Sequence, residues 1–243
     1  MVKEITYKPF GAKAILIEWD SIINDEILAD ILSFKHKIET LREGFYTDLI
    51  VGYNSLTIKY SNQFDAYLNE VEALRVIYKS NLKAQKKINY IWEIPVCYEL
   101  EFGIDLEAVS QKLNVSIDEV IKLHTNNFYT VFFIGFLPGF LYLGGLNEHL
   151  YFERKPNPRL NVAKGSVAIG GKQTGVYPFE SPGGWNIIGK TPINLFNIKK
   201  DNPCFAKAGD KIQFKSISLN LFCQIEKEIA QDQYQISKTV LDD

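Results

Sequence analysis

The chain has 243 residues, of which 46% are hydrophobic, so it can bury a sizeable core in one large or two small domains. Its formal net charge of -2 gives no sequence-wide electrostatic reason to bind nucleic acid or an anionic membrane. Three widely spaced cysteines, Cys97, Cys204 and Cys223, favour a reducing cytoplasm over a disulfide framework. No two histidines have metal-ligand spacing, so no metal site is predicted.

The N-terminal part predicts two pairs of strands and two helices. Residues 4–9 and 14–19 read as paired strands, and residues 46–51 and 56–60 as a second pair. A helix capped by Ser21 is indicated by apolar residues at three- and four-residue spacing: Ile23, Ile27, Ile31, Phe34, Ile38 and Leu41. A second helix is indicated over residues 64–78. We expect both helices to pack on one face of an antiparallel sheet.

A polar connector over residues 80–87, with three lysines, predicts a domain boundary. The two expected domains are therefore residues 1–87 and residues 88–243.

The second part predicts a mainly β domain. Residues 88–98 read as a strand, in which Pro95 suggests an edge position. Short helices follow at 105–113 and 116–124, the latter opened by a capping box. From residue 129 to about 216, short strands alternate with Gly and Pro turns, which predicts a closed or nearly closed barrel. A helix over 219–230 and a loosely held polar tail complete the chain.

Two stretches imitate other motifs. Residues 128–146 carry no charge and are long enough to span a bilayer, but Pro138 and the glycines favour two strands joined by a turn. Residues 184–191 match the phosphate-loop pattern G-x-x-x-x-G-K-[ST]. We reject that reading because Pro192 and the β-favouring isoleucines predict a strand where a phosphate loop needs a helix.

Two residues are candidates for chemistry. His124, at the end of a helix, could accept a proton or bind a carbonyl, or it could simply complete the helix C-terminus. Arg159 follows Pro156-Asn157-Pro158, which restricts where its guanidinium points. It could bind a carboxylate bidentately or form a surface salt bridge.

Several residues of the Gly- and Pro-rich segments are candidates for binding a small molecule. Gln173 and Tyr177 could hydrogen-bond an amide or lactam, or could bond within barrel loops. Apolar surface and backbone amides could wall a pocket for a small ring-shaped ligand. These expected substrate-binding residues are Phe136, Pro138, Gly139, Gln173, Tyr177, Pro182, Gly183 and Trp185.

The order of these motifs resembles one family closely. The resemblance is strongest over residues 91–214 and rests on ordered segments: His124, Tyr129, 135–146 (GFLPGFLYLGGL), Pro158-Arg159, 165–169 (GSVAI), 173–178 (QTGVYP) and 181–192 (SPGGWNIIGKTP). The chain is similar to the B subunit of the bacterial 5-oxoprolinase complex. That family also includes the Kip-type inhibitor of a sporulation histidine kinase and proteins labelled allophanate hydrolase subunit 1.

The resemblance implies an α+β fold, with a ferredoxin-like N-terminal domain followed by a cyclophilin-like β-barrel. It implies a non-autonomous component of an ATP-dependent lactam hydrolase, which with companion A and C subunits converts 5-oxo-L-proline to L-glutamate. ATP, with Mg²⁺, would then be a cofactor, bound either by the assembled complex or by this chain. His124 and Arg159 are expected at the catalytic site. The alternatives are a regulatory protein that inhibits a sensor histidine kinase, and a component that processes urea or allophanate.

Overall fold

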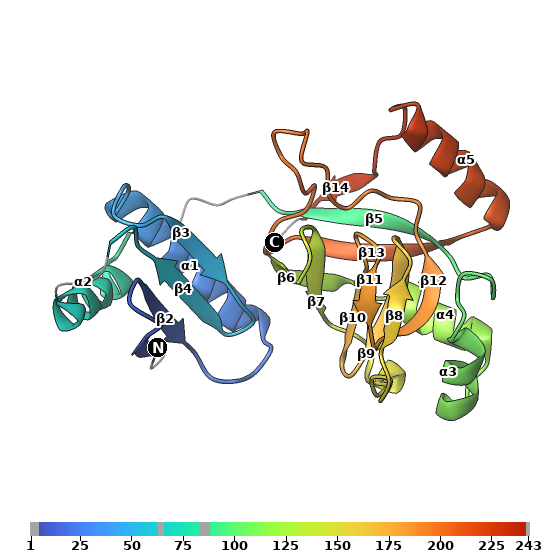
Figure 1. Ribbon diagram of the computed structural model, residues 1–243, viewed down its shortest axis with the longest axis horizontal. Coiled ribbons are helices and arrows are strands. Elements are labelled where there is room, and N and C mark those ends of the chain that lie inside the picture. The colour runs from blue at the N-terminus through green and yellow to red at the C-terminus, as the bar shows by residue number, and fades with distance from the viewer. Residues whose placement is uncertain (1–4, 63–65, 83–87, 242–243) are drawn as a thin grey trace. The chain divides into compact units, whose positions relative to one another are not determined.

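The computed structural model describes residues 5–62, 66–82 and 88–241. The chain divides into two compact units, Met1–Lys87 and Ile88–Asp243, shown in blue to teal and in green to red in Figure 1. Each unit buries an apolar core of its own. Within the described ranges, no helix combines the length and the apolar character that crossing a bilayer requires.

The first unit is a four-stranded antiparallel sheet with two helices. Its strands lie in the order β1-β2-β4-β3. The elements are β1 Thr6–Pro9, β2 Ala14–Glu18, α1 Asp25–Leu41, β3 Asp48–Val51, β4 Ser55–Lys59 and α2 Tyr67–Lys79. Since the expected second helix began at residue 64, its first residues fall outside the described ranges.

The core of the first unit follows from period-two and helical patterns. Ile15 and Ile17 are fully buried on one face of β2, and Phe34 and Ile31 of α1 join them in the same core. Helix α1 begins later than expected, because Asn24 and not Ser21 is its cap. The Asn24 side chain accepts hydrogen bonds from the first backbone amides of the helix.

The order of strands and helices along the chain of the first unit differs from that of a ferredoxin-like fold. That arrangement has the chain order βαββαβ, whereas the observed order is ββαββα. The ferredoxin-like description is therefore not confirmed. The coarser expectation, a mixed fold in which helices pack on an antiparallel sheet, holds for this unit.

The second unit is built on a strongly curved, nearly closed sheet. Its strands lie in the order β10-β9-β12-β5-β13-β6-β7, and β10 lies against β7, so the two ends of the sheet meet. The interior is packed with apolar side chains from almost every strand. This agrees with the predicted barrel, and the cyclophilin-like description stays a prediction. The strands are β5 Tyr90–Cys97, β6 Tyr129–Gly135, β7 Phe140–Gly144, β8 Arg159–Val162, β9 Ser166–Gly170, β10 Gln173–Val176, β11 Ser181–Gly183, β12 Asn186–Lys190, β13 Lys211–Ile217 and β14 Lys238–Val240.

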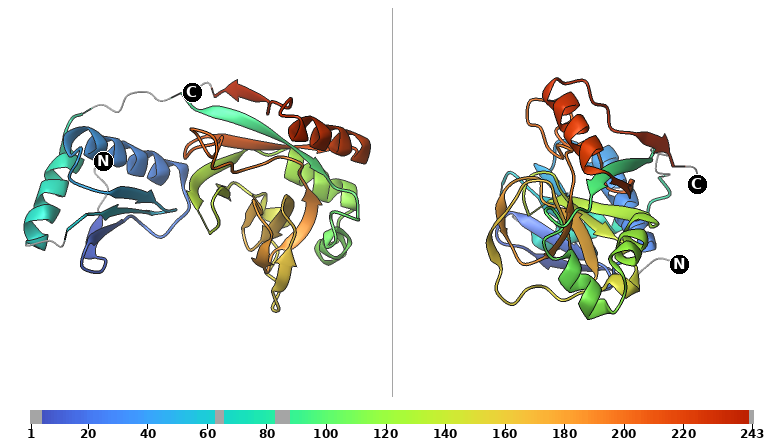
Figure 2. Two further views of the ribbon diagram at one scale, coloured as in Figure 1. Left: turned by 45° about the horizontal axis from the view of Figure 1, so that its top comes forward. Right: turned by 90° about the vertical axis from the view of Figure 1, so that its right-hand side faces the viewer.

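Helices cover separate parts of this barrel (Figures 1 and 2). The pair α3 and α4 packs together and against β12 and β13, while α5 packs against β5. Ser116 caps α4 as expected, because its hydroxyl accepts the backbone N–H of Glu119. The helical elements are α3 Leu106–Leu113, α4 Ile117–Thr125, the 3-10 turn η1 Glu148–Leu150 and α5 Leu219–Ala230.

Strand β5 is central, which corrects the expectation that Pro95 marks an edge. One side of β5 pairs with β13 along its whole length. On the other side, β14 pairs with Tyr90–Trp92 and β12 reaches only Cys97. Pro95 lies in the gap between these partners, where its missing N–H costs no ladder hydrogen bond.

The polar tail after α5, expected to be loosely held, supplies β14, which pairs with β5. The expectation of a loosely held tail was therefore wrong for residues 238–240.

The two misleading stretches fold as expected. The uncharged segment forms β6, a turn and β7, which pair antiparallel. The segment that imitates a phosphate loop contains β12, which pairs with β9, and no helix begins at Lys190. The Lys190 ammonium instead lies over the rings of Phe102 and Phe222, 5.2 and 5.7 Å from their centroids.

Candidate functional site

An apolar cavity of about 390 Å³ is lined by residues of the β6–β7 turn and β7, by the segment that precedes β8, and by β11 and the residues beside it. Five of the expected substrate-binding residues line it: Phe136, Tyr177, Pro182, Gly183 and Trp185. The other lining residues are Phe140, Tyr142, Arg154, Lys155, Pro158 and Gly184. The volume is suited to a small molecule.

Aromatic rings in edge-to-face contact form the walls of the cavity. Phe140 is the centre of this group, with ring centroids 5.0 Å from Tyr142, 6.0 Å from Tyr177 and 5.8 Å from Trp185. Such pairs stabilise one another beyond the area they bury. The walls of the cavity are therefore formed by mutually packed aromatic rings.

Glycines make room for these rings. A Cβ atom on Gly170 would lie 2.5 Å from the indole of Trp185, and one on Gly183 would collide with the hydroxyl of Tyr177. No side chain other than hydrogen fits these positions unless the rings move. The Gly-rich sequence that first suggested a site is thus explained by close packing of backbone against aromatic rings.

Phe136 stands at the rim of the cavity, in the turn between β6 and β7. The residue is 64% exposed, and its backbone has a φ of 39°, which non-glycine residues seldom adopt. The ring meets Phe140 edge to face, with centroids 5.7 Å apart. Residues in such rarely adopted backbone conformations cluster at active sites and ligand clamps, where the surrounding structure holds them.

Arg159 does not face the cavity. Its guanidinium donates to both oxygens of Asp105, from Nη1 to Oδ2 at 2.9 Å and from Nη2 to Oδ1 at 2.7 Å. Asp105, the cap residue of α3, is only 5% exposed. The expected catalytic role of Arg159 is not supported by this geometry, because both arms of the fork already bind a buried carboxylate.

Asp105 also binds a second cation and the backbone. The Lys155 ammonium lies 2.8 Å from Oδ1, and the N–H of Ile187 donates to Oδ2 at 2.8 Å. Burial raises the pKa of Asp105, but the hydrogen bonds from Arg159, Lys155 and Ile187 outweigh it and hold the pKa below its ordinary value. Asp105 is therefore ionised at neutral pH.

Arg154 contributes the most accessible charge of the cavity. Its guanidinium lies over the ring of Trp185, 5.6 Å from the centroid, and its Nη2 is 3.5 Å from Oε1 of Gln173. Gln173 is thus next to the cavity without lining it.

The hydroxyl of Tyr177 stays neutral. Burial raises its pKa, and this effect outweighs the backbone N–H of Trp185 and the nearby arginines, which lower the pKa.

His124 lies inside the barrel and is fully buried. Its ring stacks on Phe214, with centroids 4.5 Å apart and an angle of 21° between the planes. Nδ1 is 2.7 Å from the hydroxyl of Tyr98, and Nε2 is 2.8 Å from Oγ1 of Thr174. The residues that contact the imidazole are not those that line the cavity.

The hydrogen bonds of His124 define its tautomer. The hydroxyl of Thr174 donates to the carbonyl of Ala168 at 3.1 Å, so its oxygen must accept a proton from Nε2–H. Nδ1 then accepts from Tyr98. Burial lowers the pKa of His124 to about 3, so it is neutral at physiological pH. The expected catalytic role of His124 is not supported, because a buried and fully bonded imidazole cannot reach a ligand in the cavity.

Pro138 and Gly139 lie away from the cavity lining, although they were expected in it. Pro138 is exposed in the β6–β7 turn. Gly139 is buried with a φ of +83°, and a Cβ atom there would lie 2.6 Å from Cβ of Phe196. Gly139 is needed for the turn and for close packing, which explains the motif without a ligand.

Sequence reasoning missed Asp105, Arg154 and Lys155. One signal was available: Arg154-Lys155 precedes Pro156, so three cations occur within six residues ending at Arg159. Asp105 was interpreted only as a helix start. Its contact with Arg159 joins residues 54 positions apart, and only the folded chain shows it.

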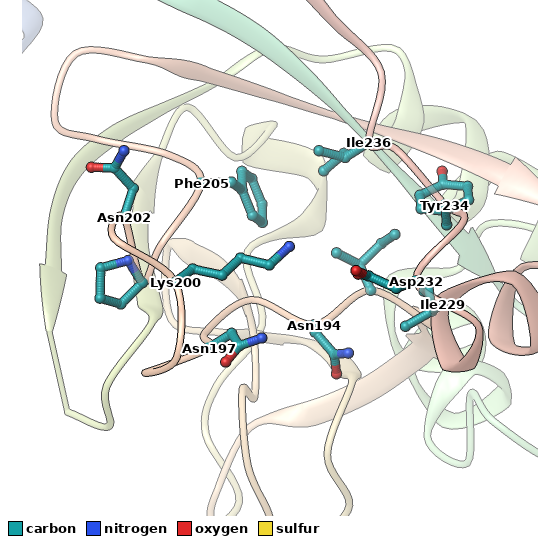
Figure 3. Close-up of a pocket in the computed structure, with 11 residues that line it drawn as sticks. Asn194, Asn197, Lys200, Asn202, Phe205, Ile229, Asp232, Tyr234 and Ile236 are labelled. Carbon is teal, nitrogen blue, oxygen red and sulfur yellow. The ribbon is translucent and has the colours of Figure 1, made fainter.

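A second, more polar cavity of about 210 Å³ lies between residues 193–205 and the chain after α5. Figure 3 shows the side chain of Lys200 extending into it and Asp232 on the opposite side. Both residues are exposed, as are the asparagines that line it, so water competes for every polar group. Neither in this cavity nor in the rest of the described residues is a group of three His, Cys, Asp or Glu side chains arranged to hold a metal ion.

The two units define a mixed α/β protein whose barrel-like second unit carries an apolar, aromatic-walled cavity. Residues 5–206 match the family "Carboxyltransferase domain, subdomain C and D". The chain is 36% identical over 221 residues to the 5-oxoprolinase B subunit of Bacillus subtilis (strain 168), covering 86% of this chain and 91% of that protein. It is 40% identical over 167 residues to the 5-oxoprolinase B subunit of Escherichia coli O157:H7, covering 69% of this chain and 76% of that protein.

Two solved structures share this architecture. An uncharacterized protein from Pyrococcus horikoshii is 38% identical, with a TM-score of 0.53 over 89% of this chain and 100% of that one. The K. lactis urea amidolyase is 18% identical, with a TM-score of 0.80 over 99% of this chain and 16% of that one, which shows a common fold. The chain belongs to the carboxyltransferase-domain family and, within it, to the family of 5-oxoprolinase B subunits, as its motifs predicted.

Proposed function

We propose that the chain is the B subunit of an ATP-dependent 5-oxoprolinase, which acts with companion A and C subunits to open 5-oxo-L-proline to L-glutamate. The observation that carries the proposal is the aromatic cavity. Its volume of about 390 Å³ can admit a small lactam, and Phe140 and Trp185 are among the aromatic residues that would offer it apolar surface. The relatives from Bacillus subtilis and Escherichia coli, both named as B subunits of 5-oxoprolinase, support the same assignment.

The role of the chain in this proposal is to bind and enclose the substrate. Neither His124 nor Arg159 is available for proton transfer at the cavity, since one is buried and the other is paired with Asp105. Groups that act directly on the lactam would then come from the companion subunits. Under this proposal, the chain alone would not open 5-oxo-L-proline.

The residues of this chain that imitate a phosphate loop do not fit ATP. Thr191 has its backbone N–H bonded to Gly165, and Lys190 lies over two phenylalanine rings. A phosphate site needs free amides at the start of a helix. We therefore assign ATP, with Mg²⁺, to the assembled complex and not to this segment of the chain.

The test is ATP-dependent glutamate release from 5-oxo-L-proline, measured with this chain alone, with the companion A and C subunits alone, and with all three. Activity only in the full mixture supports the proposal. Replacing Trp185 with Ala should then lower turnover while the complex still forms, as judged by size-exclusion chromatography. Activity of the companions without this chain would overturn the proposal.

The alternatives make different predictions in the same experiment. A complex that forms but releases no glutamate, and that turns over urea or allophanate, would assign the chain to urea-derived substrates. A chain that binds the dimerisation domain of a sensor histidine kinase and leaves glutamate release unaffected would be a regulator.

A further inference from the structure

The buried carboxylate of Asp105 is bonded by two positively charged side chains, Arg159 and Lys155. Arg159 and Lys155 both donate to Asp105 Oδ1, and Arg159 and the backbone N–H of Ile187 both donate to Oδ2. These four hydrogen bonds use the four acceptor positions of the carboxylate. The cluster of Asp105, Arg159 and Lys155 therefore carries a net charge of about +1, and one of its cations, Lys155, lines the cavity.

Arg159 and Lys155 differ in how many of their hydrogen-bond donors Asp105 occupies and in whether they line the cavity. Arg159 spends both arms of its fork on Asp105 and does not line the cavity. Lys155 does line the cavity, and its contact with Asp105 accounts for one of the three donors of an ammonium group. Lys155 is thus held in place by Asp105 while it can still donate to a ligand.

Arg154 adds a second cation on the same side. Its guanidinium lies over the ring of Trp185, 5.6 Å from the centroid, so this charge is at the aromatic wall of the cavity. Among the described residues that line the cavity, two are cations and none is an aspartate or a glutamate. An apolar cavity with this charge favours a ligand that combines a small ring with an anionic group.

We propose that Lys155 and Arg154, and not Arg159, bind the carboxylate of a small ring-shaped ligand in the aromatic cavity, with Asp105 as the residue that positions Lys155. The inference rests on the proposed function in placing the ligand in this cavity. It deepens that function by naming the residues that would bind the carboxylate of the substrate. The rings of Phe140 and Trp185 receive the cyclic part.

The inference is tested by direct binding to the full chain, measured by calorimetry and by the indole N–H resonance of Trp185. Two pairs of probes differ by the anionic group: 5-oxo-L-proline against 2-pyrrolidinone, and benzoate against benzamide. We expect the anionic member of at least one pair to bind about tenfold or more tightly than its neutral partner, as charge-assisted hydrogen bonds predict.

Single substitutions identify the cations. Lys155→Gln and Arg154→Gln should each remove most of the preference for the anionic probe and leave the affinity for the neutral probe nearly unchanged. Lys172→Gln is the matched control, because Lys172 contacts the ring of Tyr151 and does not line the cavity. Asp105→Asn should also lower the ratio of anionic to neutral affinity, whereas a purely structural role would weaken both probes alike.

The outcomes separate this inference from the proposed function. Preference for benzoate without any binding of 5-oxo-L-proline would keep the carboxylate site and remove the proposed substrate. Equal affinity for anionic and neutral probes, a preference that survives both Lys155→Gln and Arg154→Gln, or no binding of any probe would overturn the inference. Loss of the preference in Lys172→Gln would overturn it as well.

Discussion

Arg159 and Asp105 are joined by two parallel hydrogen bonds of 2.9 and 2.7 Å, although 54 residues separate them in the chain. The pair connects the first residue of β8 to the cap of α3. The backbone N–H of Ile187 donates to the same carboxylate, so β12 is joined to both. This cluster fixes the elements that lie behind the aromatic cavity, which gives Arg159 a structural role.

Removing the Arg159 side chain should therefore lower stability strongly. We expect Arg159→Ala to reduce the free energy of unfolding by about 3 kcal/mol, because one partner of a buried, bidentate pair is lost. Urea denaturation followed by tryptophan fluorescence measures it. The control is Arg154→Ala, an exposed arginine, for which we expect a loss of about 0.5 kcal/mol. Equal losses in the two variants would contradict the structural role.

The Asp105 cluster should also produce a pH dependence of stability. The pKa of Asp105 is below 3.8 in the folded protein, so the folded state binds fewer protons than the unfolded state as pH falls through that value. Its contribution is present above about pH 4 and is lost on further acidification.

The comparison of wild type with Asp105→Asn isolates this contribution from those of other carboxyl groups. Wild type should be the more stable of the two at pH 7, and the difference should shrink progressively as the pH falls below about 4. Thermal unfolding at a series of pH values measures the difference. A gap that stays constant over that range would show that the charge of Asp105 does not matter.

His124 should destabilise the protein in mild acid. Its pKa falls from 6.5 to about 3 on folding, so below pH 6.5 only the unfolded state takes up the proton. Each pH unit below 6.5 should cost about 1.4 kcal/mol until the folded pKa is reached. Between pH 7 and pH 5, wild type should lose about 2 kcal/mol more than His124→Gln, measured by urea denaturation.

A direct titration checks the same property. The imidazole resonances of His124 should not shift between pH 5 and pH 8, as two-dimensional NMR spectra of the ring can show. A His124 titration near pH 6.5 would show that the ring is accessible, and would restore it as a candidate proton acceptor.

Gly183 should be essential for the shape of the cavity. In Gly183→Ala, the new methyl group would collide with the hydroxyl of Tyr177, so that the ring must shift into the cavity or the strand must move. We expect a loss of about 1 to 3 kcal/mol in the free energy of unfolding, the usual cost of overpacking.

Gly184→Ala is the neighbouring control, since a Cβ atom there would make only an ordinary contact of 3.4 Å with the carbonyl of Lys155. Its effect on stability should be smaller than about 1 kcal/mol. Differential scanning calorimetry of the two variants measures both values. Equal melting temperatures would mean that Tyr177 adapts without cost.

The fold could be predicted wherever a local pattern carried the information. Apolar residues at helical spacing from Ile27 to Ile38 identified α1, and the Gly and Pro turns after Tyr129 identified a barrel of short strands. The first residue of α1 could not be predicted in the same way. Ser and Asn are both good caps, and only the folded chain shows that the side chain of Asn24, and not that of Ser21, accepts the backbone amides.

The sequence by itself determined the family, the strands that imitate a phosphate loop and a membrane span, and most of the aromatic residues of the cavity, because these follow from the order and spacing of residue types along the chain. Only the tertiary structure decided that His124 is buried and neutral, that Arg159 belongs to Asp105, and that Pro95 lies between two partner strands. Each of these depends on side chains or strands that meet across long sequence separations, and burial and pairing are properties of that meeting.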